Sequence, residues 1–161
     1  MHRIIILLVL TVFSLSGMNI GMADELSPWG HATTSSQPTY EKQKVLYDLT
    51  TGDAERLANI LARTGYLSKL NGDDPFNSKI VVIIHGDAIP FFTIANIKQH
   101  QQLMGLAYSQ TLNSVIEFRM CQASARLRGF KPADIHGFVS MVPMADAEII
   151  RLQQEGYAYI H

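Results

Sequence analysis

The sequence is poor in cysteine, and no stretch of it is rich in basic residues. Cys121 is the only cysteine, which excludes an internal disulfide. The 13 Lys and Arg residues are balanced by 14 Asp and Glu, and no basic cluster is interleaved with aromatic residues, so charge gives no case for nucleic-acid binding. The spacings typical of zinc sites, Walker loops and dinucleotide-binding loops are also missing. We therefore expect no cofactor and no bound metal.

The longest apolar run stands at the N-terminus and is short. It follows the basic start Met1-His2-Arg3 and covers residues 4–15, whereas a membrane span needs about 20 apolar residues. Gly21-Met22-Ala23 then provides a small-x-small cleavage site before Asp24. The pattern predicts a signal peptide over residues 1–23 and a periplasmic protein with no membrane contact after cleavage. An uncleaved membrane anchor is the alternative.

The remainder has the length of one domain. Cleavage would leave 138 residues, with 12 Lys and Arg against 14 Asp and Glu. Residues 24–43 are polar, show no apolar periodicity and predict a flexible leader. Residues 44–161 alternate between strand and helix patterns and are predicted to form a single α/β domain.

The alternation within this domain predicts a three-layer α/β/α sandwich with a mainly parallel, five-stranded sheet. The continuous apolar run at 79–84 is typical of a strand buried on both faces. The helix expected over 54–70 has its apolar residues at helical spacing and Thr51 or Asp53 as its N-cap. The other expected strands are 44–50, 114–120, 138–142 and 157–160, and the other expected helices are 97–112, 122–128 and 145–155.

Cys121 is expected where a strand passes into a helix, and Gly129 is expected to end that helix. The positive end of a helix dipole favours a thiolate over a thiol. Arg119 lies two residues back on the same face of the strand, and its charge would act in the same direction. The alternative is that Cys121 is a small buried hydrophobe.

Other candidates are less specific. His85 and Asp87 follow the expected strand 79–84, and parallel strands would place them at the same sheet edge as Cys121, where they could form a Cys-His-Asp set. His85 could equally be a strand-end histidine bonded to the backbone. His100 and His136 could join it around a metal, but no metal-ligand spacing connects them.

The order of these segments resembles the DsrE/DsrF-like proteins. The features that carry the resemblance are strand 79–84 ending in His85-Gly86, the segment 115–121 ending in Cys121, Met141-Val142-Pro143, and the closing helix and strand 148–159. The resemblance implies a parallel sheet of five strands and assembly into trimers or hexamers. In cytoplasmic sulfur-relay members a cysteine matching Cys121 carries sulfur as a persulfide and passes it to a partner protein.

Three functions remain open. The first is a periplasmic sulfur carrier that uses Cys121 as its persulfide site, with Arg119 as thiolate stabiliser, His85 as a further candidate, and a donor or acceptor protein as partner. The second is a non-catalytic oligomeric module that binds a small ligand or a partner. The third is a thiol or metal sensor.

Overall fold

The computed structural model describes residues 29–34, 36, 40 and 42–161. The chain divides into two units, Met1–Pro38 and Thr39–His161. In the first unit the described residues form no helix or strand. The predicted signal peptide over residues 1–23 lies outside the described residues, as does part of the predicted leader.

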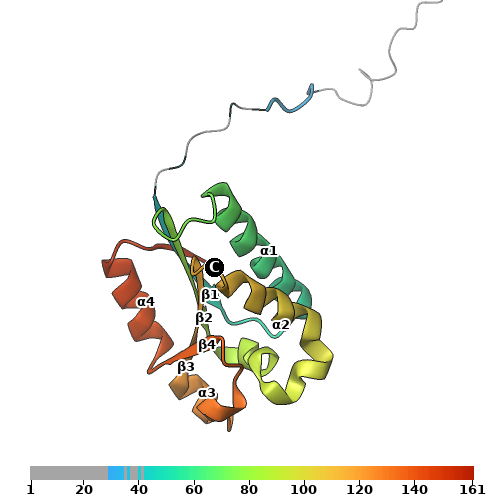
Figure 1. Cartoon of the computed structure of the whole chain (residues 1–161), viewed down its shortest axis with the longest axis vertical. Coiled ribbons are helices and arrows are strands. Elements are labelled where there is room, and N and C mark those ends of the chain that lie inside the picture. The colour runs from blue at the N-terminus through green and yellow to red at the C-terminus, as the bar shows by residue number, and fades with distance from the viewer. Residues whose placement is uncertain (1–28, 35, 37–39, 41) are drawn as a thin grey trace, which may run out of the picture. The chain divides into compact units, whose positions relative to one another are not determined.

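The second unit alternates between strands and helices, and Figure 1 shows the sheet between α4 on one side and α1 and α2 on the other. The strands are β1 (Gln43–Leu49), β2 (Ser78–Ile84), β3 (Ile116–Cys121), β4 (Val139–Val142) and β5 (Ala158–Ile160). The α-helices are α1 (Ala54–Leu70), α2 (Ile97–Thr111), α3 (Gln122–Leu127) and α4 (Ala145–Gln154). Three 3-10 segments are η1 (Gly86–Phe92), η2 (Ile94–Asn96) and η3 (Pro132–Asp134). In the described part of the chain, no helix has both the length and the apolar character needed to cross a bilayer.

The sheet has the order β4-β3-β2-β1-β5, and every neighbouring pair is parallel. The predicted α/β sandwich with a parallel five-stranded sheet is therefore confirmed. The chain adds β2, β3 and β4 on one side of β1, and then returns through α4 to place β5 on the other side. Parallel pairing brings the carboxyl ends of all five strands to one edge.

The centre of the core is β2, whose residues Ile80–Ile84 are all fully buried. Alternate residues of this strand join separate clusters on the two faces of the sheet. Ile80, Val82 and Ile84 pack in the cluster that also contains residues of α1 and α2. Val81 and Ile83 pack with Cys121 and with Ala145 and Leu152 of α4. Burial on both faces explains the unbroken apolar run that predicted this strand.

The helix termini follow local rules that the sequence predicted. Asp53 is the N-cap of α1, and its carboxylate accepts hydrogen bonds from the backbone N–H groups of Glu55 and Arg56 at 2.8 and 3.1 Å. Gly129, which has a φ of 81°, follows the last turn of α3 as predicted. The 3-10 segments η1 and η2 were not predicted. They lengthen the connection from β2 to α2 by a stretch without helical periodicity.

Gly86 controls how the chain leaves β2. Its φ is 60°, a left-handed conformation that disfavours side chains, and an added Cβ would lie 3.5 Å from the carbonyl oxygen of Thr50. We predict that Gly86→Ala lowers the free energy of unfolding by about 1 kcal/mol, measured by urea denaturation. The matched control is Gly105→Ala within α2, where an added Cβ meets nothing within 4 Å. This control should raise stability by about 0.5–1 kcal/mol through helix propensity. Equal effects of the two substitutions would contradict the role given to Gly86.

Candidate functional site: a thiol at the carboxyl edge of the sheet

The strand register places His85 and Cys121 side by side. The last paired residues of β2 and β3 are Ile84 and Met120, so the next residue of each strand stands at an equivalent position. Neighbouring strands lie about 4.8 Å apart. His85 and Cys121 are also in phase with Ile83 on the sheet face that α4 covers. The sequence expectation that the two residues share one edge is thus met by their backbone positions.

The Cys121 side chain caps the start of α3. Its Sγ accepts a hydrogen bond from the backbone N–H of Ser124 at 3.3 Å, and the residue is 4% exposed. The Ser124 hydroxyl oxygen in turn accepts from the backbone N–H of Gly86 at 3.1 Å. The start of α3 is therefore tied both to the thiol and to the end of β2. Sulfur at this position faces a backbone donor, which stabilises negative charge on it.

His85 is held by a carboxylate from the next strand. Its Nε2 lies 2.7 Å from Oδ1 of Asp48, and Oδ2 of Asp48 accepts a hydrogen bond from the Tyr159 hydroxyl at 2.6 Å. The bond to Asp48 raises the pKa of His85 above its usual value, although burial opposes this, and Asp146 of α4 adds a smaller favourable charge. The same bond lowers the pKa of Asp48. The bond to Asp48 also raises the pKa of Tyr159 to about 12.

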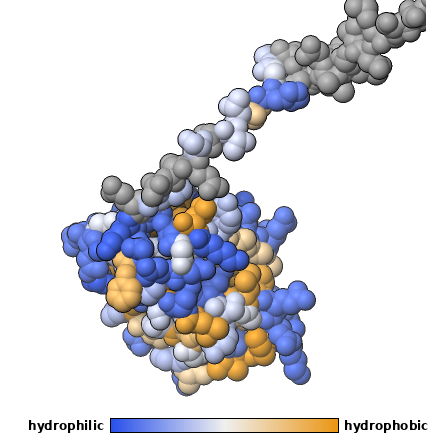
Figure 2. All heavy atoms as spheres, turned by 45° about the horizontal axis from the view of Figure 1, so that its top comes forward, coloured by the Kyte–Doolittle hydropathy of each residue, from blue (hydrophilic) through white to orange (hydrophobic). Residues whose placement is uncertain are grey.

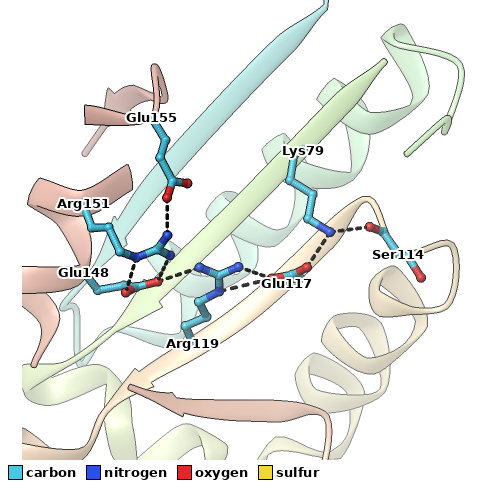
Figure 3. Close-up of polar contacts among 7 residues, drawn as sticks. All are labelled: Lys79, Ser114, Glu117, Arg119, Glu148, Arg151 and Glu155. Carbon is cyan, nitrogen blue, oxygen red and sulfur yellow. Dashed lines mark hydrogen bonds and ion pairs between the residues drawn. The ribbon is translucent and has the colours of Figure 1, made fainter. Parts of the chain in front are cut away.

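Arg119 projects from β3 into an ion-pair network (Figure 3). Its guanidinium pairs with Glu117 and, at 2.6 Å, with Glu148 of α4. Burial lowers the pKa of Arg119, but the hydrogen bonds to the two glutamates outweigh it and leave the pKa raised. Lys79 also pairs with Glu117, and Arg151 pairs with Glu148. The network shows what holds Arg119 in place, and the proposed effect of its charge on Cys121 stays a prediction.

The remaining sequence candidates lie in separate contacts. Asp87 forms an ion pair with Arg128 at 2.5 Å, whereas the carboxylate that bonds His85 is that of Asp48. His100 packs edge-on against Phe91, with 4.6 Å between ring centroids. His136 stacks on Phe138, and burial lowers the pKa of its imidazole. Among the described residues, no three His, Cys, Asp or Glu side chains converge as they would around a metal ion.

Sequence reasoning missed three members of the site. The sequence places Asp48 only within the expected strand 44–50, Ser124 only within the expected helix 122–128, and Tyr159 only within the expected strand 157–160. One usable signal is Asp48 itself, because a carboxylate near the end of a mostly apolar strand needs a partner. Choosing His85 as that partner required the strand order, which the sequence did not provide.

These features define a class of protein: a parallel α/β sandwich with a single thiol at a strand-to-helix junction and a carboxylate-bound histidine on the adjacent strand. The family model described as DsrE/DsrF-like matches residues 44–161. The chain therefore belongs to the DsrE/DsrF-like family, as its sequence pattern predicted.

The solved structures add support for the fold. A protein of unknown function from Methanobacterium thermoautotrophicum is similar to this chain, with a TM-score of 0.57 and 20% sequence identity. The match covers 73% of this chain and 97% of that one. At this identity the likeness concerns the fold alone. No curated protein matches the chain.

The contact between Asp48 and His85 predicts that one substitution should lower the pKa of His85. Asp48→Asn removes the charge that favours imidazolium and leaves the burial that opposes it, so we expect the pKa of His85 to fall. Histidine titration by NMR measures this directly. The control is Asp87→Asn, which removes a nearby carboxylate that pairs with Arg128 instead. An unchanged His85 titration in Asp48→Asn would show that the pair does not set its charge.

The same pair has a defined effect on stability. Because folding raises the pKa of His85, this residue contributes to the free energy of unfolding. The contribution is fully present at pH values below the unfolded-state pKa of about 6.5, and it is lost as the pH rises through the folded-state pKa.

Proposed function

We propose that this protein handles sulfur in the periplasm, with Cys121 as a persulfide carrier. The observation that carries the proposal is the placement of Sγ at the start of α3, where it accepts the Ser124 N–H at the sheet edge next to His85. Membership of the DsrE/DsrF-like family supports a sulfur-relay role in general terms. The assignment to Cys121, the carrier step and the compartment belong to the proposal.

The proposed step is a sulfur transfer between two sulfur compounds. The Cys121 thiolate attacks the outer, sulfane sulfur of a persulfide or polysulfide donor and forms a new S–S bond. The S–S bond inside the donor breaks, and its electron pair leaves with the donor thiolate, which takes a proton from water. The reverse reaction passes the outer sulfur to an acceptor thiolate. Sulfane sulfur moves from one thiolate to another, so no external oxidant or reductant is needed.

The surrounding groups would serve this step by stabilising negative charge. The Ser124 N–H contacts Sγ directly. The bond to Asp48 raises the pKa of His85, and the protonated imidazole would supply a positive group at the end of the adjacent strand. Arg119 is the proposed third contributor. Because Cys121 is 4% exposed, sulfur transfer also requires the groups that cover the thiol to move, such as the start of α3 or the part of α4 around Ala145.

The burial of Cys121 favours a second candidate function. A thiol packed with Ile83 and Ala145 has the surroundings of a small core residue. In that case the protein would be a non-catalytic oligomeric module that binds a small ligand or a partner at the same edge. The third candidate, a thiol or metal sensor that uses Cys121 with His85, has no matching set of three metal ligands among the described residues for its metal form.

The thiol prediction separates the two leading functions. Incubation with inorganic polysulfide should add the mass of one sulfur atom to the native protein, located at Cys121 by peptide mass spectrometry and absent in Cys121→Ser. His85→Gln and Arg119→Met should each slow alkylation of the thiol at neutral pH by roughly two- to fivefold, the factor for about 0.3–1 kcal/mol of charge stabilisation. Arg126→Gln is the control, because this exposed arginine lies on the far turn of α3. A thiol that reacts only after unfolding would eliminate the carrier and leave the binding module.

The export proposal rests on the basic start, the short apolar run and the Gly21-Met22-Ala23 cleavage site, all outside the described residues. We predict a processed protein that begins at Asp24 and is recovered in the periplasmic fraction, as intact-mass measurement would show. Full-length protein confined to membranes would instead indicate an uncleaved anchor.

The assembly proposal rests on the edges and surface of the sheet domain. Both edge strands are short, since β4 has four residues and β5 has three. Large apolar side chains remain exposed in the single chain, among them Phe76, Leu112 and Leu127. Apolar side chains also gather along one side of the face seen in Figure 2. We predict a homo-oligomer, a trimer or a hexamer, and a monomer by light scattering at micromolar concentration would contradict it.

A further inference from the structure

A crevice of about 600 Å³ opens beside the carboxyl end of β1. It lies along the first half of α1 and also contacts the residue that follows β5. Its lining includes Thr50, Arg56, Asn59, Ile60, Arg63 and His161. Neither Cys121 nor His85 lines it, so the crevice is distinct from the thiol site.

The position of the crevice follows from the strand order. The chain places β2, β3 and β4 on one side of β1 and β5 on the other, so the direction of strand addition reverses beside β1. The helices α1 and α4 accordingly cover opposite faces of the sheet (Figure 1). In open α/β sheets, ligands bind outside the carboxyl ends of the strands at such a reversal.

Two arginines in the crevice have no carboxylate partner. Within the described residues, Arg119, Arg128 and Arg151 form ion pairs, whereas Arg56 and Arg63 form none. The guanidinium of Arg63 lies over the ring of Tyr47, 5.5 Å from its centroid, and this contact leaves its N–H groups free to bind an anion.

Two of the three carboxylate side chains that line the crevice accept hydrogen bonds from other groups of the protein. Asp48 is bonded to both His85 and Tyr159. Asp53 accepts hydrogen bonds from two backbone N–H groups as the cap of α1. Glu55 alone among the lining carboxylates has no partner in the described part of the chain. The hydrogen bonds of Asp53 do not remove its charge, so the charges of Asp53 and Glu55 stand beside those of the two arginines, while His85 offsets Asp48. Among the described lining residues, Arg56 and Arg63 carry the unpaired guanidinium groups, and an acidic group of a ligand would bind there.

The spacing of the arginines sets the length of that ligand. Arg56 and Arg63 are seven residues apart on α1, which places their Cα atoms about 10 Å apart along the helix axis. Ile60 lies between them on the crevice wall and offers an apolar surface. Asn59 and Thr50, both exposed, offer hydrogen-bonding groups. A ligand whose two anionic groups are separated by a chain of comparable length could contact one guanidinium group at each end.

We propose that this crevice binds an elongated small organic dianion, with one carboxylate on Arg56, the other on Arg63, and an apolar chain along Ile60. This proposal does not rest on the sulfur chemistry proposed for Cys121, although Asp48 lines the crevice and also bonds His85. The crevice gives the protein a ligand-binding function that would persist in a variant without the thiol.

Suberate, a dicarboxylate with six methylene groups, is the probe. Titration followed by NMR and calorimetry should give a dissociation constant below about 1 mM, with chemical shift changes at crevice residues. Octanoate and 1,8-octanediol keep the chain and remove one or both charges. Each should bind at least about tenfold more weakly, because a charge-assisted hydrogen bond contributes about 1.5–3 kcal/mol.

The variants assign the binding to the two arginines. Arg56→Gln and Arg63→Gln should each weaken suberate binding at least about tenfold, whereas Arg126→Gln, which removes an arginine outside the crevice, should not. Cys121→Ser should bind suberate as tightly as the natural sequence, and the double Arg56→Gln, Arg63→Gln variant should still take up sulfur if Cys121 is a carrier. Equal affinity for suberate and octanoate, or no effect of either arginine substitution, would overturn the proposal.

Discussion

The parallel pairing of β2 on both of its edges is the constraint on which the structure depends. Its five apolar residues Ile80–Ile84 are fully buried, and each large side chain removed from water contributes about 1.5–3 kcal/mol. Burial on both faces also fixes the register of β2. A shift by one residue would exchange its two faces and misplace every contact in both clusters. The registers of β1 and β3 are fixed against this strand. His85 can therefore stand level with Cys121 and within reach of Asp48 only because β2 lies between their strands.

Asp48 is the residue where the two proposed sites meet. It holds His85 on one side and accepts the Tyr159 hydroxyl on the other, and it also lines the crevice that contains Arg56. Bonding to two donors lowers its pKa, so it stays ionised throughout the neutral range. An ionised Asp48 that lacked His85 would add a free negative charge to the crevice and oppose a dianion there. The pair with His85 thus stabilises a cation beside the thiol and offsets a negative charge that would oppose anion binding in the crevice.

The sequence was sufficient for the fold because the fold rests on local patterns. The apolar run of β2, the helical spacing of α1 and the Asp53 cap each predict their element without knowledge of the rest. The segment 86–96 was not predicted, because its 3-10 turns have no apolar period and depend on contacts such as the bond from Asp87 N–H to the Thr50 carbonyl. The site was predicted only in outline. The positions of Cys121 and His85 at strand ends can be read from the sequence. Identifying Asp48, and not Asp87, as the partner of His85 requires the order of β1, β2 and β3.

The charges around the thiol largely compensate one another, and this decides which contact matters most. Lys79, Arg119 and Arg151 alternate with Glu117, Glu148 and Glu155, so this network (Figure 3) has no net charge. His85 is likewise offset by Asp48. Opposite charges held at hydrogen-bond distance produce a field that weakens rapidly with distance, whereas the Ser124 N–H lies 3.3 Å from Sγ. The helix α3 has only six residues, so its contribution comes from these first-turn amides rather than from a long dipole. Any movement of α3 that admits a sulfur donor would alter this contact first, which couples access to the thiol with loss of its nearest stabilising group.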